Sequence, residues 1–300
     1  MRPNTITFPP DGVKPLGIIQ FVHGMAEYRN RYFDTMKKFN QYGFICAITD
    51  LRGHGENVMT KDDLGYFGDK STYKDLIEDV HDYTMFLKRE YPNLPLILLG
   101  HSMGSLIVRA YTKKYAKEID ALIVSGSPSN NPLAGIAKLM IDAMVIFKGW
   151  RYHSETMAKL VTGPFEKAFD KEGIRNSWLS RDRNVVDAYN ADPLCGFTFS
   201  LNGYYILMTL LQQVYTKKGW GSKNAALPVM FMSGSNDPCK GNEKTFKKSV
   251  MFFKHCGFSN TYSKLYPDMR HELFNELENE IVYKDIIKFL EIKAGIEFPI

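Results

Sequence analysis

Short apolar runs alternate along this chain of 300 residues with longer segments of helical periodicity, and this alternation constrains the fold more than any other feature. The apolar runs are residues 17–22, 44–49, 94–99, 121–124, 228–232 and 262–266. The helical segments are residues 72–91, 103–116, 242–256 and 280–293. Most runs are almost continuously apolar, which is typical of strands covered on both faces of a parallel sheet. We therefore expect an α/β fold with a mostly parallel central sheet and helices on both faces.

One long segment interrupts this alternation. Residues 130–226 lie between two predicted strands, and their apolar residues recur at helical spacing. A loop of this length without secondary structure would be unusual in a compact domain. We expect an inserted helical cap over the carboxyl edge of the sheet. The predicted division is a core of residues 1–129 and 227–300 and a cap of residues 130–226.

The charge pattern excludes some classes of partner. The formal net charge is +5, and the short runs of lysine lie among apolar residues at helical spacing, as on solvated helix faces. Nucleic-acid binding would need basic residues clustered on one face, so we expect no nucleic-acid partner. Such a charge allows at most a transient contact with an anionic membrane surface.

The cysteines and the N-terminus bear on the location of the protein. Cys46, Cys195, Cys239 and Cys256 are far apart and form no C-x-x-C pair, so neither a zinc site nor a disulfide framework is expected. The first ten residues contain no apolar core of a signal peptide, and the most apolar stretch is too short to cross a bilayer. We expect a cytoplasmic protein.

The motif Gly100-His-Ser-Met-Gly104 carries the sharpest chemical signal. A G-x-S-x-G pentapeptide is weak alone, but here a predicted strand leads into it and a predicted helix follows. Strand, sharp turn and helix form a nucleophile elbow, in which Gly100 and Gly104 permit the tight turn and Ser102 is lifted above the sheet. The alternative is a glycine-rich turn with an idle serine. We favour Ser102 as a catalytic nucleophile.

A serine hydroxyl needs a base to take its proton, and in this fold type the chain order is serine, acid, histidine. Among the later histidines, His153 falls in the expected cap and His255 in a helix, whereas His271 follows the last predicted strand. We therefore predict His271 as the base. Asp237 follows another strand, in a Gly/Ser turn, and is the predicted acid.

Two acidic rivals flank the predicted base. Asp268 and Glu272 lie on the same loop as His271, which makes the required geometry difficult. Asp237 also has an alternative interpretation, as an ordinary Asp-Pro turn residue.

An oxyanion hole needs two donors aimed at the developing charge. One predicted donor is the backbone N–H of Met103, and the other is that of Met25, which Gly24 at the end of a strand allows to turn inward. Gly24 could instead be a simple strand-ending turn. We expect Arg52 and His54 to fix loops by hydrogen bonds, because their segment lacks the Lys-Ser/Thr of a phosphate loop. No metal ligands and no cofactor site are predicted.

Several segments together resemble the monoacylglycerol lipase and lysophospholipase-like group of α/β hydrolases. They are Phe21–Tyr32, Asp50–Gly55, Leu99–Ser105, Asp192–Leu194, Ser233–Asp237 and Arg270–Glu276. They occur in the order of that family and cover most of the chain. The resemblance implies an α/β-hydrolase fold, Ser102, Asp237 and His271 as the triad, and Met25 and Met103 as oxyanion donors. Two departures are a shortened N-terminal β-meander and Tyr28, which stands where the family often has histidine.

These features together predict a serine hydrolase that cleaves carboxylic esters through an acyl-enzyme. The apolar residues of the expected cap suggest a slot for an acyl chain, so the expected substrate is a single-chain lipid ester, a monoacylglycerol or lysophospholipid. The same residues of the cap could serve only to pack it on the sheet. Three alternatives stay open: a short-chain esterase, a peptidase on the same triad, and a catalytically silent protein that binds a small ligand.

Overall fold

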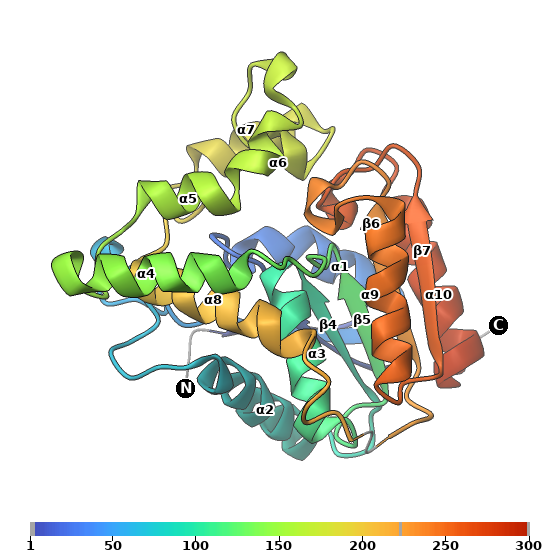
Figure 1. The fold of residues 1–300 in the computed structure, drawn as a ribbon. Coiled ribbons are helices and arrows are strands. Elements are labelled where there is room, and N and C mark those ends of the chain that lie inside the picture. The colour runs from blue at the N-terminus through green and yellow to red at the C-terminus, as the bar shows by residue number, and fades with distance from the viewer. Residues whose placement is uncertain (1–3, 222–223, 299–300) are drawn as a thin grey trace.

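A single mixed sheet organises the computed structural model, which describes residues 4–221 and 224–298 (Figure 1). Its seven strands in this part of the chain are β1 Asn4–Thr7, β2 Gly17–Val22, β3 Phe44–Thr49, β4 Leu96–His101, β5 Ala121–Ser125, β6 Val229–Gly234 and β7 Thr261–Tyr266. Their order across the sheet is β1-β3-β2-β4-β5-β6-β7. The pairs from β3 to β7 are parallel, and only β1 pairs antiparallel, with β3. The fold is thus the expected α/β class.

Helices cover both faces of this sheet. They are α1 Phe33–Gln41, α2 Tyr73–Glu90, α3 Met103–Tyr115, α4 Ala134–Lys148, α5 Glu155–Val161, α6 Gly163–Lys167, α7 Arg183–Ala191, α8 Leu201–Val214, α9 Glu243–His255 and α10 Glu280–Ala294. One buried cluster joins the sheet to α2, α3, α8 and α9, and a second joins the opposite face to α1 and α10.

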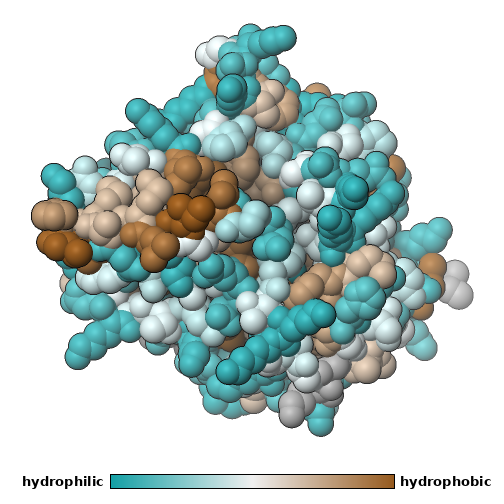
Figure 2. Space-filling view, in the orientation of Figure 1, coloured by the Kyte–Doolittle hydropathy of each residue, from teal (hydrophilic) through white to brown (hydrophobic). Residues whose placement is uncertain are grey.

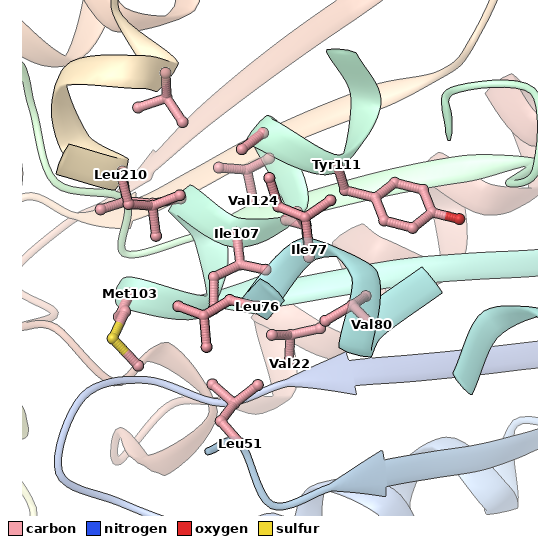
Figure 3. Packing of buried hydrophobic residues seen from close by; sticks show 14 of the residues in the cluster. Val22, Leu51, Leu76, Ile77, Val80, Met103, Ile107, Tyr111, Val124 and Leu210 are labelled. Carbon is pink, nitrogen blue, oxygen red and sulfur yellow. The ribbon is translucent and has the colours of Figure 1, made fainter. Parts of the chain in front are cut away.

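The central strands β2 to β6 are mostly apolar because each supplies both clusters. In β4, Leu96 and Leu98 belong to the first cluster, whereas Ile97 and Leu99 belong to the second. This alternation is the two-residue period of a strand with both faces buried. Figure 3 shows part of the first cluster, in which Ile107 of α3 packs near Leu76 of α2. At about 25 cal/mol per Å², such complete burial of apolar surface is the main stabilising contribution to the fold.

The long segment between β5 and β6 is helical, as expected. Figure 1 shows α5, α6 and α7 grouped above the sheet, with α4 and α8 between them and α3. Helix α8 packs along both α4 and α3, and its buried residues belong to the first cluster. It therefore also serves as the crossover helix between two parallel strands. The proposed division into core and cap at residues 130 and 226 stays a prediction.

The predicted elements differ from the observed ones mainly at their ends. Strand β4 begins and ends two residues later than the apolar run 94–99, so that it includes Gly100 and His101. Strand β1 and helix α1 were not predicted. In the described residues before β2, β1 is the single strand. No helix of the described chain combines the length and apolarity needed to cross a bilayer.

Candidate active site

Ser102 occupies the predicted strand–turn–helix elbow. Strand β4 ends at His101, Ser102 takes φ 52° and ψ −118°, and α3 begins at Met103. This backbone conformation is sparsely populated for any residue with a side chain, and such strain gathers at functional sites. A Cβ atom at Gly104 would overlap the carbonyl oxygens of Val22 and His23. Only glycine therefore lets α3 approach β2 closely enough to form the turn.

The sheet also brings Asp237 and His271 together. Asp237 follows β6 and His271 follows β7, and the Nδ1 atom of His271 lies 3.0 Å from Oδ1 of Asp237. The Asp237 carboxylate accepts two further hydrogen bonds, from the Ser233 hydroxyl and the Cys239 amide, each 2.8 Å long. An ionised carboxylate can only accept, so Nδ1 of His271 carries the proton and Nε2 keeps its lone pair.

Burial and charge act in opposite directions on this pair. Both side chains are almost completely buried, at 1 % exposure each. Burial disfavours the imidazolium, but the Asp237 carboxylate outweighs it and raises the pKa of His271 above its usual value of 6.5. Burial likewise opposes ionisation of Asp237, but His271 and the donated hydrogen bonds lower the pKa of Asp237 below its usual 3.8. The acid is therefore ionised at neutral pH.

Two backbone N–H groups are the predicted oxyanion donors, and their residues line the same cavity as Ser102. That of Met103 is at the first position of α3, where an amide has no acceptor within its own helix. The other belongs to Met25. The Leu51 amide donates to Nε2 of His23 over 2.9 Å, so Nδ1 carries the proton and donates to the Gly24 carbonyl over 2.9 Å. Because C=O and N–H of one trans peptide point in opposite directions, the Met25 N–H points away from the buried His23 ring.

Gly24 brings this peptide close to the elbow. A Cβ atom at Gly24 would lie 3.1 Å from the Cβ atom of Ser102 and 2.7 Å from Oε1 of Glu27. The Gly24 amide donates to that same Oε1 atom over 2.5 Å. The interpretation of Gly24 as a simple strand end therefore does not account for its close packing against Ser102.

A cavity of about 850 Å³ joins these groups. Ser102, His271, Met25 and Met103 all line it. Most of its other walls come from the segment between β5 and β6, through apolar side chains of Leu133, Ala137, Leu160, Val161, Phe165, Trp178, Leu207, Met208 and Leu211. The cavity thus has a polar floor at the carboxyl ends of the strands and a mainly apolar roof, to which Glu155, Lys159, Glu166 and Arg175 add charged groups.

Comparison with known proteins places this arrangement in a family. The chain matches the family model described as "Serine aminopeptidase, S33" over residues 13–278. The chain belongs to this family of α/β hydrolases.

The proteins similar to this chain are named after different substrates. The monoacylglycerol lipase of Mycolicibacterium smegmatis is 28% identical over 92% of this chain and 88% of the relative. Phospholipase YtpA of Bacillus subtilis is 24% identical over 90% of this chain and 93% of the relative. Among solved structures, a thermostable carboxyl esterase from Bacillus coagulans superimposes with a TM-score of 0.87, at 26% identity, over 97% of this chain and 94% of the other.

The residues considered as alternatives to Asp237 and His271 lie elsewhere or have other hydrogen-bond partners. Glu272 forms two hydrogen bonds to Arg31, of 2.6 and 2.7 Å, rather than one to His271. Asp268 follows β7 in a left-handed turn with φ 59°. His153 bonds the carbonyls of Thr198 and Asp62, and His255 is exposed at the end of α9.

Two aromatic rings beside His271 were not predicted as functional. The ring centroids of Trp178 and His271 are 4.9 Å apart, and those of His101 and His271 are 4.6 Å apart. Burial and the neighbouring His271 lower the pKa of His101 to about 4, so His101 adds no charge at neutral pH. The sequence offered no signal for Trp178, which lies about 90 residues from His271 along the chain.

The predicted loop-fixing roles of Arg52 and His54 are confirmed. Arg52 donates to the Asp79 carboxylate through Nε over 2.5 Å and Nη2 over 2.8 Å. His54 bonds the Arg52 carbonyl and the Ala26 amide.

Side-chain atoms of Asp237, Cys239 and His271 lie within 4.8 Å of one another, a grouping that could hold a metal ion and that sequence spacing did not reveal. The Asp–His hydrogen bond already accounts for two of the three groups. Burial raises the pKa of the Cys239 thiol well above its usual value, so the thiolate that metals prefer is disfavoured. We assign the grouping to the Asp–His pair.

Proposed function

We propose that the protein hydrolyses carboxylic esters through an acyl-enzyme, with Ser102 as nucleophile, His271 as base and Asp237 as acid. The observation that carries this proposal is the Asp237–His271 hydrogen bond in the same cavity as Ser102 on its strained turn. The backbone amides of Met25 and Met103 serve as oxyanion donors.

The mechanism follows from these positions. Ser102 Oγ attacks the ester carbonyl while Nε2 of His271 takes its proton, and Asp237 stabilises the resulting imidazolium. The carbonyl oxygen becomes an oxyanion held by the two amides, each contributing roughly 3 kcal/mol of barrier lowering. His271 then protonates the leaving alcohol. It next activates a water molecule that releases the acid and restores Ser102, and this general acid–base catalysis contributes about 10²–10⁴-fold.

A single-chain lipid ester is the substrate that best fits the cavity. Its volume of about 850 Å³ and its apolar roof suit an acyl chain, with the polar floor left for the ester. The names of the Mycolicibacterium and Bacillus subtilis relatives, a monoacylglycerol lipase and a phospholipase, agree with such a substrate.

The family description keeps a peptidase as the second candidate. The Bacillus coagulans protein is described as a carboxyl esterase, which does not separate a short-chain ester from a lipid ester. An aminopeptidase must bind the ammonium group of its substrate, and four glutamates line the cavity: Glu27, Glu155, Glu166 and Glu272. Each already accepts hydrogen bonds from protein groups: Arg31 on Glu27 and Glu272, Thr198 on Glu155, and Trp178 on Glu166. Because these carboxylates already have protein donors, a lipid ester is favoured over a peptide.

An apolar patch beside the cavity supports a transient contact with membrane lipid. Figure 2 shows it as brown residues over α4. The patch consists of the exposed side chains of Leu133, Ile136, Leu139, Met140, Ile146 and Phe147. Ile146 is 77% exposed and Phe147 85%, and Leu133 also lines the cavity. Leu133 thus joins the patch to the cavity, an arrangement that suits entry of a lipid from a membrane surface.

A fluorophosphonate probe tests the enzymatic proposal. Labelling of the native protein and loss of labelling in Ser102→Ala are expected. Unlabelled native protein, or equal labelling of the variant, would favour the catalytically silent ligand-binding protein. Rates on p-nitrophenyl esters of increasing chain length then test the substrate: a maximum at acetate with no activity on long chains would reject a lipid, and cleavage of aminoacyl amides in preference to esters would favour the peptidase.

Vesicle sedimentation tests the membrane contact. With vesicles of phosphatidylcholine and phosphatidylserine, the variant Ile146→Ser/Phe147→Ser should bind roughly 10-fold more weakly than the native protein, because two large apolar side chains are lost. Ile292→Ser removes an exposed apolar residue from α10 and is the matched control. Equal binding of all three proteins would exclude the patch as the contact.

A cytoplasmic location, expected from the four free cysteines, stays a prediction.

A further inference from the structure

Ala26 has an unusual backbone conformation next to an oxyanion donor. It directly follows Met25, it is buried, and its φ is +53°. A residue with a Cβ atom rarely adopts this left-handed conformation, which persists only where surrounding contacts enforce it. We call residues 23–28 the oxyanion loop. The contacts that hold Ala26 therefore decide the shape of this loop.

From the core side, His54 holds the amide of Ala26. The Ala26 N–H donates to Nε2 of His54 over 3.2 Å, and Nδ1 of His54 lies 2.7 Å from the Arg52 carbonyl oxygen. A carbonyl can only accept, so Nδ1 carries the proton and Nε2 is free to accept from Ala26. Burial keeps the imidazole neutral, because it lowers the pKa of His54 well below the usual value.

From the opposite side, the segment between β5 and β6 holds the carbonyl of Ala26. The Tyr189 hydroxyl, on α7, donates to this oxygen over 2.9 Å. The Gly196 amide donates to the same oxygen, also over 2.9 Å. A third bond joins the same two segments, because the Tyr28 hydroxyl donates to Oδ2 of Asp192 over 2.8 Å. Residues 189–196 thus bind the oxyanion loop at Ala26 and at Tyr28.

We propose that residues 189–196 position the oxyanion donor of Met25 by holding Ala26 in its left-handed conformation. The inference rests on the proposed hydrolase function and adds Tyr189, Asp192 and Tyr28 to it as positioning residues. Without the two donors on its carbonyl, Ala26 can relax to negative φ, and the peptide planes next to it turn with it. The oxyanion site is therefore complete only while residues 189–196 are seated on the loop, which makes ester cleavage dependent on that contact.

The variant Tyr189→Phe tests this role. It removes one donor from Ala26 and keeps the ring, over which the guanidinium of Arg31 lies at 4.7 Å. Loss of one net hydrogen bond corresponds to a roughly 3- to 10-fold lower kcat, with KM unchanged. Tyr152→Phe, a half-exposed tyrosine of the same inserted segment that does not line the cavity, is the matched control and should keep the native kcat.

Two ligands, one that forms an oxyanion and one that does not, distinguish a positioning role of Tyr189 from a general structural effect. A trifluoromethyl ketone with an alkyl chain forms a tetrahedral adduct with Ser102 and places an anion in the oxyanion site. Its inhibition constant should weaken by the same factor as kcat in Tyr189→Phe. The matching alkyl ether, which forms no adduct, should bind both proteins equally.

Three outcomes would overturn the proposal while leaving the hydrolase function intact: native kcat in Tyr189→Phe, a change confined to KM, or equal weakening of the ketone and the ether. If Tyr189→Phe does not fold, Tyr28→Phe carries the same test, because Tyr28 lies outside the cavity lining and its hydroxyl donates to Asp192 at the other point of contact. The hydrolase function itself fails separately, when native protein neither takes up the fluorophosphonate probe nor cleaves esters.

Discussion

The Nδ1 atom of His271 lies 3.0 Å from Oδ1 of Asp237, across 34 residues of sequence. Adjacent parallel strands β6 and β7 end at the same edge of the sheet, so the turns after them bring the two side chains together. The hydrogen bond fixes the tautomer of the imidazole and leaves Nε2 as its only proton acceptor.

Replacing Asp237 by Asn should preserve the shape of the site and remove most of its activity. The amide can donate as well as accept, so the imidazole is free to adopt the other tautomer, with its proton on the nitrogen that should act as base. We expect kcat to fall by roughly 10³–10⁴-fold with little change in KM. Steady-state kinetics on a p-nitrophenyl ester measures this. Asp187→Asn, an exposed aspartate on α7, is the control and should keep native kinetics.

The pH dependence of kcat/KM of the native enzyme should reflect the raised pKa of His271. Below this pKa the imidazole is protonated and cannot accept the Ser102 proton, so kcat/KM falls as the pH is lowered. The midpoint of this acid limb should therefore lie above 6.5. In Asp237→Asn the stabilising charge is gone while burial remains, so the midpoint should move to lower pH. An unchanged midpoint in the variant would mean that another group titrates.

The sequence was sufficient to predict the parts of the site that depend on local pattern. Gly100 and Gly104 around Ser102, and the polar turns after β6 and β7, are signals that a chain carries in neighbouring residues. The parallel arrangement then places them at one edge, which is why Ser102, Asp237 and His271 could be selected before the structure was known.

The supporting contacts could not be predicted in the same way. Trp178 on His271 and Tyr189 on Ala26 join segments separated by long stretches of chain, and nothing in their local pattern marks them. Helix α8 shows the same limit: its apolar spacing predicted a helix, but the spacing does not tell whether that helix packs on α3 or on a cap. Such choices depend on tertiary packing, which local periodicity does not encode.

Backbone strain at Ser102 should make glycine more stabilising than alanine at this position, which is the reverse of their usual order in helices. At ordinary helical positions Ala is more stabilising than Gly by about 1 kcal/mol. At φ 52° and ψ −118°, Gly is free of the strain that a Cβ atom suffers, so Ser102→Gly should be more stable than Ser102→Ala by about 1 kcal/mol or more. Chemical denaturation of both variants measures the difference. Lys247→Gly and Lys247→Ala on the exposed face of α9 provide the comparison, in which Ala should be the more stable.

Arg31 compensates two buried carboxylates beside the site, and its loss should destabilise the fold. Its guanidinium lies 2.7 Å from Glu27 and 2.6 Å from Glu272, and both carboxylates are buried while the Arg31 side chain is 11% exposed. Breaking a buried pair from one side leaves uncompensated charge, so Arg31→Met should lower the free energy of unfolding by about 3–5 kcal/mol at pH 7. The exposed pair Arg183–Asp187 gives the control, because Arg183→Met should cost under about 1 kcal/mol.

The pH dependence of this loss identifies its cause. Burial alone would raise the pKa of Glu272, but Arg31 overcomes it and lowers that pKa from 4.5 to about 2. A lowered pKa stabilises the fold above the unfolded value and loses that effect as the pH falls toward the folded one. The difference between native protein and Arg31→Met should therefore shrink as the pH falls from 4.5 toward 2, because protonated carboxylates no longer need the guanidinium. A difference that stays constant over this range would show that Arg31 stabilises the fold by packing rather than by charge.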